Sequence, residues 1–124
     1  MILLVEDEPA SRYALAQTLR SHGYEVKEAA DGNQALALIQ ELLFQKLPID
    51  LVITDLRMPN ENGLVLAAHI HVKWPKVPML LMSGYLSEQA GKLVAEGFAE
   101  FIHKPIDPPT LIAAVQRILQ KHDS

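Results

Sequence analysis

The chain has 124 residues, of which 49% are hydrophobic and 21% charged, and this composition is typical of one globular domain with a single core. Its net charge of −4 argues against a nucleic-acid surface, because its eleven lysines and arginines are scattered along the chain. The lack of cysteine excludes disulfides and thiolate zinc sites, and the lack of a signal peptide or a long apolar run predicts a cytoplasmic protein that binds no membrane.

Five short apolar runs alternate along the chain with segments of helical periodicity. The expected strands are Ile2–Val5, Tyr24–Glu28, Leu51–Thr54, Met79–Met82 and Phe101–Ile102. Three of these runs are almost continuously apolar, as is typical of strands that are covered on both faces. Tyr24–Glu28 instead alternates between apolar and polar residues, which predicts an edge strand.

The intervening segments carry helix signals. Pro9 predicts the start of the first helix, and Asp31 with a glutamine three residues later resembles a capping box at the start of the second. The third and fourth helices are expected at about Gly63–Lys73 and Ser87–Glu96. Asp107, directly before a proline, predicts the start of the last helix, whose apolar residues form one stripe.

Strands that alternate with helices predict a parallel sheet, because consecutive parallel strands need a crossover and the crossover is usually a helix. The expected fold is therefore one α/β domain over residues 1–124, a three-layer sandwich in which five helices flank a five-stranded sheet. Ligands of such sheets bind outside the carboxyl ends of the strands, near the point where the strand order reverses.

Polar residues follow four of the predicted strands. They are Glu6 and Asp7, Asp55, Ser83 and Lys104. In a parallel sheet they meet at one edge, where two carboxylates ~4 Å apart repel by ~4 kcal/mol at an effective dielectric of about 20. Lys104 and a divalent cation would neutralise this charge, and a set of oxygen ligands favours Mg²⁺ over zinc. Such a site suits a phosphoryl group, and an unpaired carboxylate oxygen in it can act as the nucleophile.

These residues, in this order, resemble the receiver domain of bacterial two-component response regulators. The resemblance covers essentially the whole chain, through "ILLVEDE", "DLRMPNENG", "LLMSGY" and "FIHKP". It implies a CheY-like, flavodoxin-like sheet with the strand order 2-1-3-4-5. The segment "LLMSGY" is also similar to receivers fused to the carboxyl end of hybrid sensor kinases.

The resemblance implies roles for the acidic residues. Asp55 would be the phosphoacceptor, and Asp7 and Asp55 would supply carboxylate ligands for Mg²⁺. Glu6 would act on the ion mainly through water, and the backbone carbonyl of Arg57 would complete the protein ligands.

Further roles follow from the same resemblance. Ser83 would bond a phosphoryl oxygen, and Lys104, followed by a proline that in this family is typically on a cis bond, would pair with the phosphoryl group. Phe101 sits where the family carries an aromatic residue that rotates inward on activation. Arg57 and Tyr85 flank the expected site on two loops, and we expect them to form a lid that slows loss of the phosphoryl group.

The expected function is a switch that accepts a phosphoryl group from a sensor histidine kinase or a histidine phosphotransfer domain and passes a conformational change to an output. It would catalyse only its own phosphorylation and dephosphorylation, and it would bind no nucleic acid itself. The output stays open, because the chain is either a single-domain regulator or part of a longer protein.

The sequence argues against three other functions. A flavin or nucleotide carrier needs a glycine-rich loop of backbone amides after the first strand, where this chain has "EDEPAS". A haloacid-dehalogenase-like phosphatase places its nucleophile in a D-x-D pattern that "VEDEP" does not provide. The acidic, hydroxyl and lysine positions argue against a receiver-like module that only binds partners.

Simpler interpretations compete for single residues. Gly63 and Pro59 are most simply residues that shape the backbone of the loop. The alternative for Phe101 is an ordinary core residue. The alternative for Arg57 and Tyr85 is that both side chains extend into solvent or contact the kinase.

Overall fold

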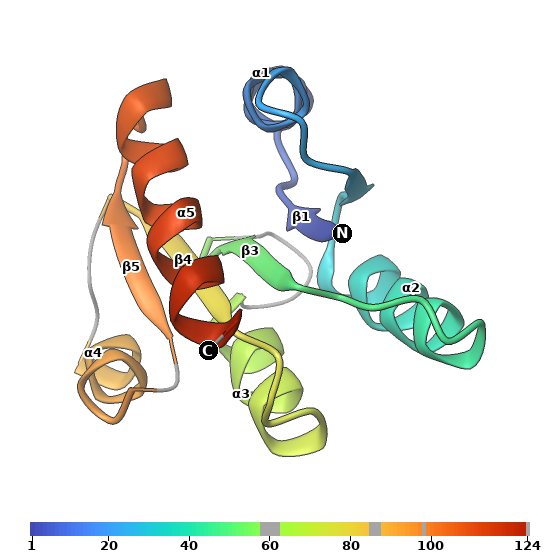
Figure 1. Ribbon diagram of the computed structural model, residues 1–124. Coiled ribbons are helices and arrows are strands. Elements are labelled where there is room, and N and C mark those ends of the chain that lie inside the picture. Colours follow the sequence, from blue (N-terminus) through green and yellow to red (C-terminus); the bar gives the residue numbers. More distant parts are fainter. Residues whose placement is uncertain (58–62, 85–87, 98, 124) are drawn as a thin grey trace.

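The computed structural model describes residues 1–57, 63–84, 88–97 and 99–123, in which strands and helices alternate (Figure 1). The elements are β1 (Ile2–Val5), α1 (Pro9–Ser21), β2 (Val26–Ala29), α2 (Gly32–Phe44), β3 (Leu51–Asp55), α3 (Gly63–Lys73), β4 (Met79–Ser83), α4 (Glu88–Ala95), β5 (Glu100–His103) and α5 (Pro108–Asp123). The predicted alternation of strands and helices is therefore confirmed.

The five strands form one parallel sheet in the order β2-β1-β3-β4-β5, as the resemblance implied. The order reverses at β1, which has β2 on one side and β3 on the other. Asp55 stands in register with Met82, and Ser83 stands in register with His103. The carboxyl ends of these neighbouring strands therefore lie along one edge of the sheet, as expected.

Two apolar layers cover the two faces of the sheet. Side chains of α1 and α5 pack with Ile2 and Leu4 on one face, whereas those of α2, α3 and α4 pack with Leu3 and Val5 on the other. Figure 1 shows these two groups of helices on opposite sides of the strands. Successive residues of β1 point to opposite faces, and both faces are covered, which explains why the strand is apolar throughout.

The expected edge strand is β2, but it starts two residues later than predicted and is not simply alternating. Val26 is buried against the α1 and α5 layer, and Ala29 is buried against the opposite layer. Lys27 and Glu28 between them are exposed at the edge. Pairing with β1, which aligns Ile2 with Val26, therefore sets the limits of this strand.

The predicted starts of the second and last helices are confirmed by capping contacts. The Oδ1 atom of Asp31 accepts a hydrogen bond from the N–H of Gln34 at 2.8 Å at the start of α2. The Gln34 side chain in turn accepts from the N–H of Ala30 at 2.9 Å, one residue earlier than in a capping box. At α5, Asp107 accepts from the N–H of Thr110 at 3.0 Å.

Within the described ranges, no helix combines the length and the apolar character needed to cross a membrane.

Candidate functional site

The polar residues that follow the strands come together at the carboxyl edge of the sheet, as predicted. Glu6, directly after β1, is fully buried, and Asp55, the last residue of β3, is 4% exposed. Lys104 follows β5, and its ammonium group lies 2.8 Å from Glu6 Oε1 and 2.7 Å from Asp55 Oδ2. One lysine thus bridges the two buried carboxylates and offsets part of their repulsion.

Both carboxylate oxygens of Asp55 have donors. Oδ2 accepts from Lys104, and Oδ1 accepts from the backbone N–H of Arg57 at 3.0 Å. The turn after β3 therefore folds back so that its own amide holds the aspartate side chain. The Arg57 side chain is exposed.

Two contacts from the first turn of α1 hold Glu6, and sequence reasoning did not find them. The Ser11 hydroxyl donates to Glu6 Oε1 at 3.0 Å, and Arg12 Nη1 donates to the Glu6 backbone carbonyl at 2.8 Å. A helix that begins at Pro9, so soon after β1, must carry its first turn back over the strand end. The short gap between strand and helix was the only signal for these contacts.

The acidic cluster has the donor set of a hard-cation site. Glu6, Asp7 and Asp55 each offer an oxygen, and these three atoms lie within 4.8 Å of one another. Glu6 and Asp55 are buried, whereas Asp7 is half-buried. Oxygen ligands with one side open to water fit Mg²⁺, which keeps several of its own waters, so these residues fit the ion that the resemblance implied.

The burial and charge of the site shift its protonation equilibria. Burial, together with the Glu6 carboxylate, raises the pKa of Asp55 even though Lys104 and the Arg57 amide act against the rise. Burial and Glu6 also raise the pKa of Asp7. Burial alone would raise the pKa of Glu6, but the Lys104 ammonium and the hydrogen bond from Ser11 lower it. The cluster therefore holds a proton more readily than isolated aspartates do.

Lys104 shows the opposite response. Desolvation by burial lowers its pKa, but the contacts with Asp55 and Glu6 outweigh burial, and the pKa of Lys104 is raised. The ammonium is therefore charged throughout the neutral pH range, which an electrostatic role at this site requires.

Ser83 and the residues around Lys104 complete the described edge. Ser83 ends β4 and is 2% exposed, and its carbonyl accepts from the Lys104 N–H at 2.9 Å. The Lys104–Pro105 peptide bond is cis, as the resemblance implied. The Ser83 side chain thus lies on the strand next to that of Asp55.

Phe101 is half-buried on β5, at the outer side of the sheet. Its ring packs against the core layer formed with α2, α3 and α4. It also meets the His103 ring edge-on, with the ring centroids 4.8 Å apart and the planes at 89°. A partly exposed ring is compatible both with a switch residue and with a core residue, so the assignment of Phe101 stays a prediction.

Gly63 is more than the loop punctuation that the sequence suggested. A Cβ atom at this position would lie 2.1 Å from the Asp55 carbonyl oxygen and 2.7 Å from the Leu56 Cα. The Gly63 N–H also donates to the Leu56 carbonyl at 3.2 Å. The start of α3 therefore packs directly on the backbone that carries Asp55. The predicted roles of Pro59 and Tyr85 lie outside the described residues.

A parallel sheet of order 2-1-3-4-5, with an acidic pocket closed by a lysine at its carboxyl edge, defines a receiver-type signalling domain. The family model of the response regulator receiver domain matches residues 2–116, and the chain therefore belongs to that family.

Two curated relatives illustrate the setting of such domains. The sensor kinase CckA of Brucella abortus is 35% identical over 98% of this chain, which corresponds to 13% of the kinase. A probable transcriptional regulatory protein of Picosynechococcus is 33% identical over 97% of the chain and 49% of the regulator. The chain therefore spans half or less of the length of these relatives.

Two solved structures match the fold closely. The receiver domain of the hybrid histidine kinase CckA is 39% identical, with a TM-score of 0.79 over 96% of this chain and 98% of that chain. A CheY-like receiver domain protein from Methanospirillum hungatei JF-1 is 27% identical, with a TM-score of 0.86 over 98% and 94% of the two chains.

Proposed function

We propose that the chain is the phosphoacceptor switch of a two-component phosphorelay and that Asp55 receives the phosphoryl group. The observation that carries the proposal is the environment of Asp55. This buried carboxylate has a lysine ammonium on one oxygen and a backbone amide on the other, beside two further carboxylates. Membership of the receiver family supports the same role.

The transfer would be in line at Asp55. A bond forms between one Asp55 carboxylate oxygen and phosphorus, while the bond from phosphorus to the leaving atom of the donor breaks. Lys104, which now pairs with Asp55 and Glu6, would turn to the phosphoryl oxygens and stabilise their charge. Ser83 would donate its hydroxyl to another phosphoryl oxygen.

We further propose that Glu6, Asp7 and Asp55, with the backbone carbonyl of Arg57, form the Mg²⁺ site, and that Glu6 acts mainly through water. A bound divalent cation supplies positive charge that stabilises the transferring phosphoryl group. The chain's own residues place the carboxylates, and Lys104 keeps the two buried ones together before the ion binds.

Signal output requires that phosphorylation change a two-state equilibrium. To change the ratio of active to inactive conformation from 1:99 to 99:1, phosphorylation must stabilise the active conformation by about 5.5 kcal/mol relative to the inactive one. Charge-assisted bonds from Ser83 and Lys104 to the phosphoryl group are the source that we propose. Phe101, which is half-buried on the neighbouring strand β5, would report the change by turning inward.

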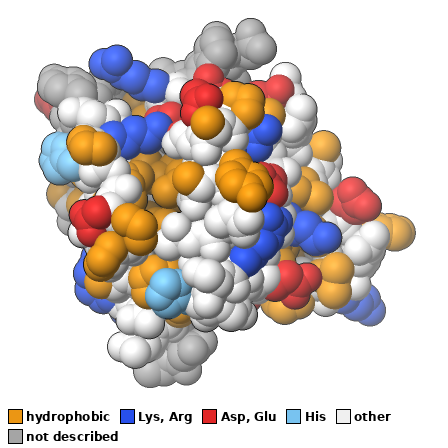
Figure 2. Space-filling view, turned by 90° about the horizontal axis from the view of Figure 1, so that it is seen from above, with side chains coloured by type: hydrophobic (Ala, Val, Ile, Leu, Met, Phe, Trp, Pro, Cys, Tyr) orange, Lys and Arg blue, Asp and Glu red, His pale blue; other side chains and the backbone are white. Residues whose placement is uncertain are grey.

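The proposed partner is a sensor histidine kinase or a histidine phosphotransfer domain, and the proposed location is the cytoplasm. Similarity to receiver segments of a sensor kinase and of a transcriptional regulator supports such a partner. Figure 2 shows basic and acidic side chains intermixed on the viewed face, which supports the proposal that this face binds no nucleic acid. The domain, which we propose to extend over residues 1–124, would act as a signalling unit and catalyse only its own phosphorylation and dephosphorylation.

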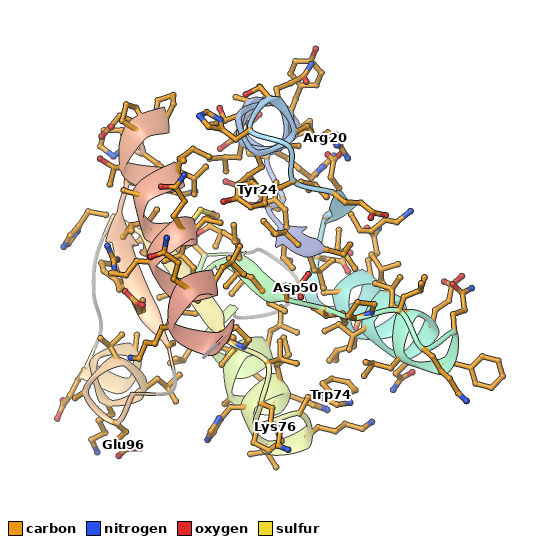
Figure 3. The ribbon with its side chains drawn as sticks, in the orientation of Figure 1. Arg20, Tyr24, Asp50, Trp74, Lys76 and Glu96 are labelled. Carbon is orange, nitrogen blue, oxygen red and sulfur yellow. The ribbon has the colours of Figure 1, made fainter. Side chains whose placement is uncertain are left out.

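The decisive experiment is labelling with a small acyl- or amidophosphate donor in the presence of Mg²⁺. Asp55→Asn should abolish labelling, because an amide is a poor nucleophile and removes a ligand charge. Asp50→Asn is the matched control, since Asp50 precedes β3 at the opposite end of the strand (Figure 3). Retention of most label in Asp55→Asn would show that another residue accepts the phosphoryl group and would contradict the assignment of Asp55. No label on the wild-type protein would contradict the proposal as a whole and favour a module that only binds partners.

A further inference from the structure

We propose that Arg12 is a positioning residue for the metal site. By holding the peptide plane between Glu6 and Asp7, it would set the affinity of the acidic cluster for Mg²⁺. The inference rests on the proposed function, because it assumes that this cluster binds the ion. Arg12 itself would touch neither the ion nor the phosphoryl group.

The first observation is the contact between Arg12 and the strand end. Arg12 Nη1 donates to the Glu6 carbonyl at 2.8 Å. That carbonyl belongs to the peptide group that joins Glu6 to Asp7, and a peptide group is planar. A guanidinium that fixes the direction of the carbonyl therefore also fixes the direction in which the backbone enters Asp7.

The second observation is that Arg12 is itself anchored. Its Nε lies 3.5 Å from Glu28 Oε1 on β2, and its side chain is 22% exposed. Arg20, two turns later on α1, lies 3.1 Å from Glu28 Oε2 and donates to the Val26 carbonyl at 2.9 Å. Figure 3 shows Arg20 on the side of α1 that faces the following strand, β2. Glu28 is thus held between two arginines of one helix, so Arg12 reaches the site from an ordered position.

The three acidic residues differ in how they are held. Glu6 is fully buried, and its carboxylate accepts from Lys104 and Ser11. Asp55 has Lys104 and the Arg57 amide. Asp7 is half-buried on the turn after β1, so its place depends strongly on the backbone that Arg12 holds. Mg²⁺ demands near-octahedral geometry, and a poorly placed Asp7 would weaken binding.

The charge of Arg12 and its positioning role predict opposite changes in Mg²⁺ affinity when Arg12 is replaced, and this difference makes the inference testable. A positive guanidinium near a cation site disfavours the cation, so its removal would strengthen Mg²⁺ binding if charge were its only effect. If Arg12 positions Asp7, its removal weakens Mg²⁺ binding instead. Residues that orient metal ligands typically change affinity by about 10–100-fold when they are removed.

The experiment compares Arg12→Gln with Arg20→Gln by isothermal titration calorimetry of Mg²⁺. Both changes remove one positive charge that pairs with Glu28, but Arg20 contacts the Val26 carbonyl instead of the Glu6 carbonyl. We expect about tenfold weaker binding in Arg12→Gln and less than twofold change in Arg20→Gln. The Asp7 amide resonance of the metal-free protein should move in Arg12→Gln only.

Phosphorylation kinetics separate positioning from general damage. In Arg12→Gln the Mg²⁺ concentration at half-maximal labelling should rise, whereas the rate at saturating Mg²⁺ should stay near that of the wild type. Arg12→Lys keeps the charge, but its compact ammonium lacks the guanidinium fork, so it should bind Mg²⁺ more weakly than the wild type.

The outcomes are distinct. Wild-type or tighter Mg²⁺ binding in Arg12→Gln would overturn the inference, and so would equal weakening in both glutamine variants. If Arg12→Gln does not fold, Arg12→Lys decides, because it keeps the charge: weaker Mg²⁺ binding than in the wild type supports the inference, and unchanged binding overturns it. A wild-type protein that binds no Mg²⁺ would instead overturn the proposed metal site itself.

Discussion

Lys104 Nζ lies 2.7 Å from Asp55 Oδ2, although the two residues are 49 positions apart in the chain. The contact joins the end of β3 to the loop after β5, two strands that are separated in the sheet by β4. The Lys104 side chain is 31% exposed and that of Asp55 is 6% exposed, so the pair is only partly screened by water. The protonation of the acidic cluster should therefore depend on this lysine.

Lys104→Ala should raise the pKa of Asp55 further, because the buried carboxylate loses its nearest positive charge. The metal-free protein should also lose on the order of 2 kcal/mol of stability. Breaking a fully buried ion pair costs about 3–5 kcal/mol, and this pair is only partly buried. Carboxyl ¹³C NMR titration and urea unfolding would measure the two effects. The variant should stay folded but lose the coupling between phosphorylation and partner binding.

Two results would contradict this prediction. An unchanged Asp55 titration would show that Lys104 does not control the charge of the cluster. Equal partner affinity with and without the phosphoryl group, in wild type and variant alike, would show that there is no coupling for Lys104 to carry.

The raised pKa values of Asp7 and Asp55 predict how stability depends on pH. Above 3.8, the ordinary aspartate value, the unfolded chain releases protons that the folded site still holds. The contribution of these two groups to metal-free stability should therefore fall as the pH rises through their folded-state pKa values. The lowered pKa of Glu6 acts in the opposite direction, and its contribution is lost as the pH falls.

Mg²⁺ should reverse the effect of the two aspartates, because the ion binds their deprotonated forms. The rise in melting temperature on adding Mg²⁺ should be larger at pH 8 than at pH 5, since protons compete with the ion at the lower pH. Thermal unfolding with and without Mg²⁺, with Asp55→Asn as the control, would measure the difference. A Mg²⁺ effect that does not change with pH would contradict the proposed ligand set.

Gly63→Ala should be strongly destabilising and should disturb Asp55. The new methyl group would lie 2.1 Å from the Asp55 carbonyl oxygen, and both contacts under 3 Å are with backbone, which cannot simply turn away. We expect a loss of about 3 kcal/mol or more, together with weaker phosphorylation of the folded fraction. Gly91→Ala in α4 is the matched control, because nothing lies within 4 Å of its added carbon. It should stabilise the protein by about 0.5–1 kcal/mol. Similar stability of the two variants would refute the close contact.

The sequence predicted those parts of the fold that depend on local pattern. The run Ile2–Val5 is the observed β1 without adjustment, because a strand covered on both faces must be apolar throughout. β2 was misplaced by two residues at its start, because its limits depend on pairing with β1 and on two core layers. No local pattern contains that information.

In the candidate site, too, the residues that follow from local pattern were predicted and those that depend on packing were not. Glu6, Asp55 and Lys104 were predicted because each follows a strand, and a parallel sheet brings strand ends together. Arg12 and Gly63 were not assigned to the site because their roles arise from the approach of a helix to a strand end. Such an approach depends on packing and leaves no spacing rule in the chain.

The lid formed by Arg57 and Tyr85 stays a prediction. Hydrolysis of an aspartyl phosphate requires water in line with the breaking bond, so side chains over that approach would lengthen its lifetime. The Arg57 side chain is exposed beside Asp55, and Tyr85 lies outside the described residues. Arg57→Ala and Tyr85→Ala should each accelerate loss of label, with less than additive effects in the double variant. Slower or unchanged hydrolysis in both single variants would exclude the lid.

The contact between Phe101 and His103 leads to the last prediction, which concerns the switch. An edge-on aromatic pair contributes about 0.5–1.5 kcal/mol, and this pair holds the Phe101 ring in its half-buried position. If Ser83 moves toward the phosphoryl group, the space beside β4 becomes available and the ring gains by burying apolar area. The two contacts therefore compete for one side chain.

His103→Ala should shift Phe101 toward the inward position before phosphorylation, by about 2–10-fold in the equilibrium constant. Aromatic NMR of Phe101, with and without a phosphoryl mimic, would measure both positions. His69→Ala on α3 is the control, because His69 is an exposed histidine on a helix and not on the strand that carries the ring pair. In the wild type the ring should become less exposed with the mimic, and in His103→Ala the change should be smaller because part of it has already occurred. One unchanged environment for Phe101 in all these samples would show that the ring is a core residue, with the contact to His103 serving only to pack the edge of the sheet.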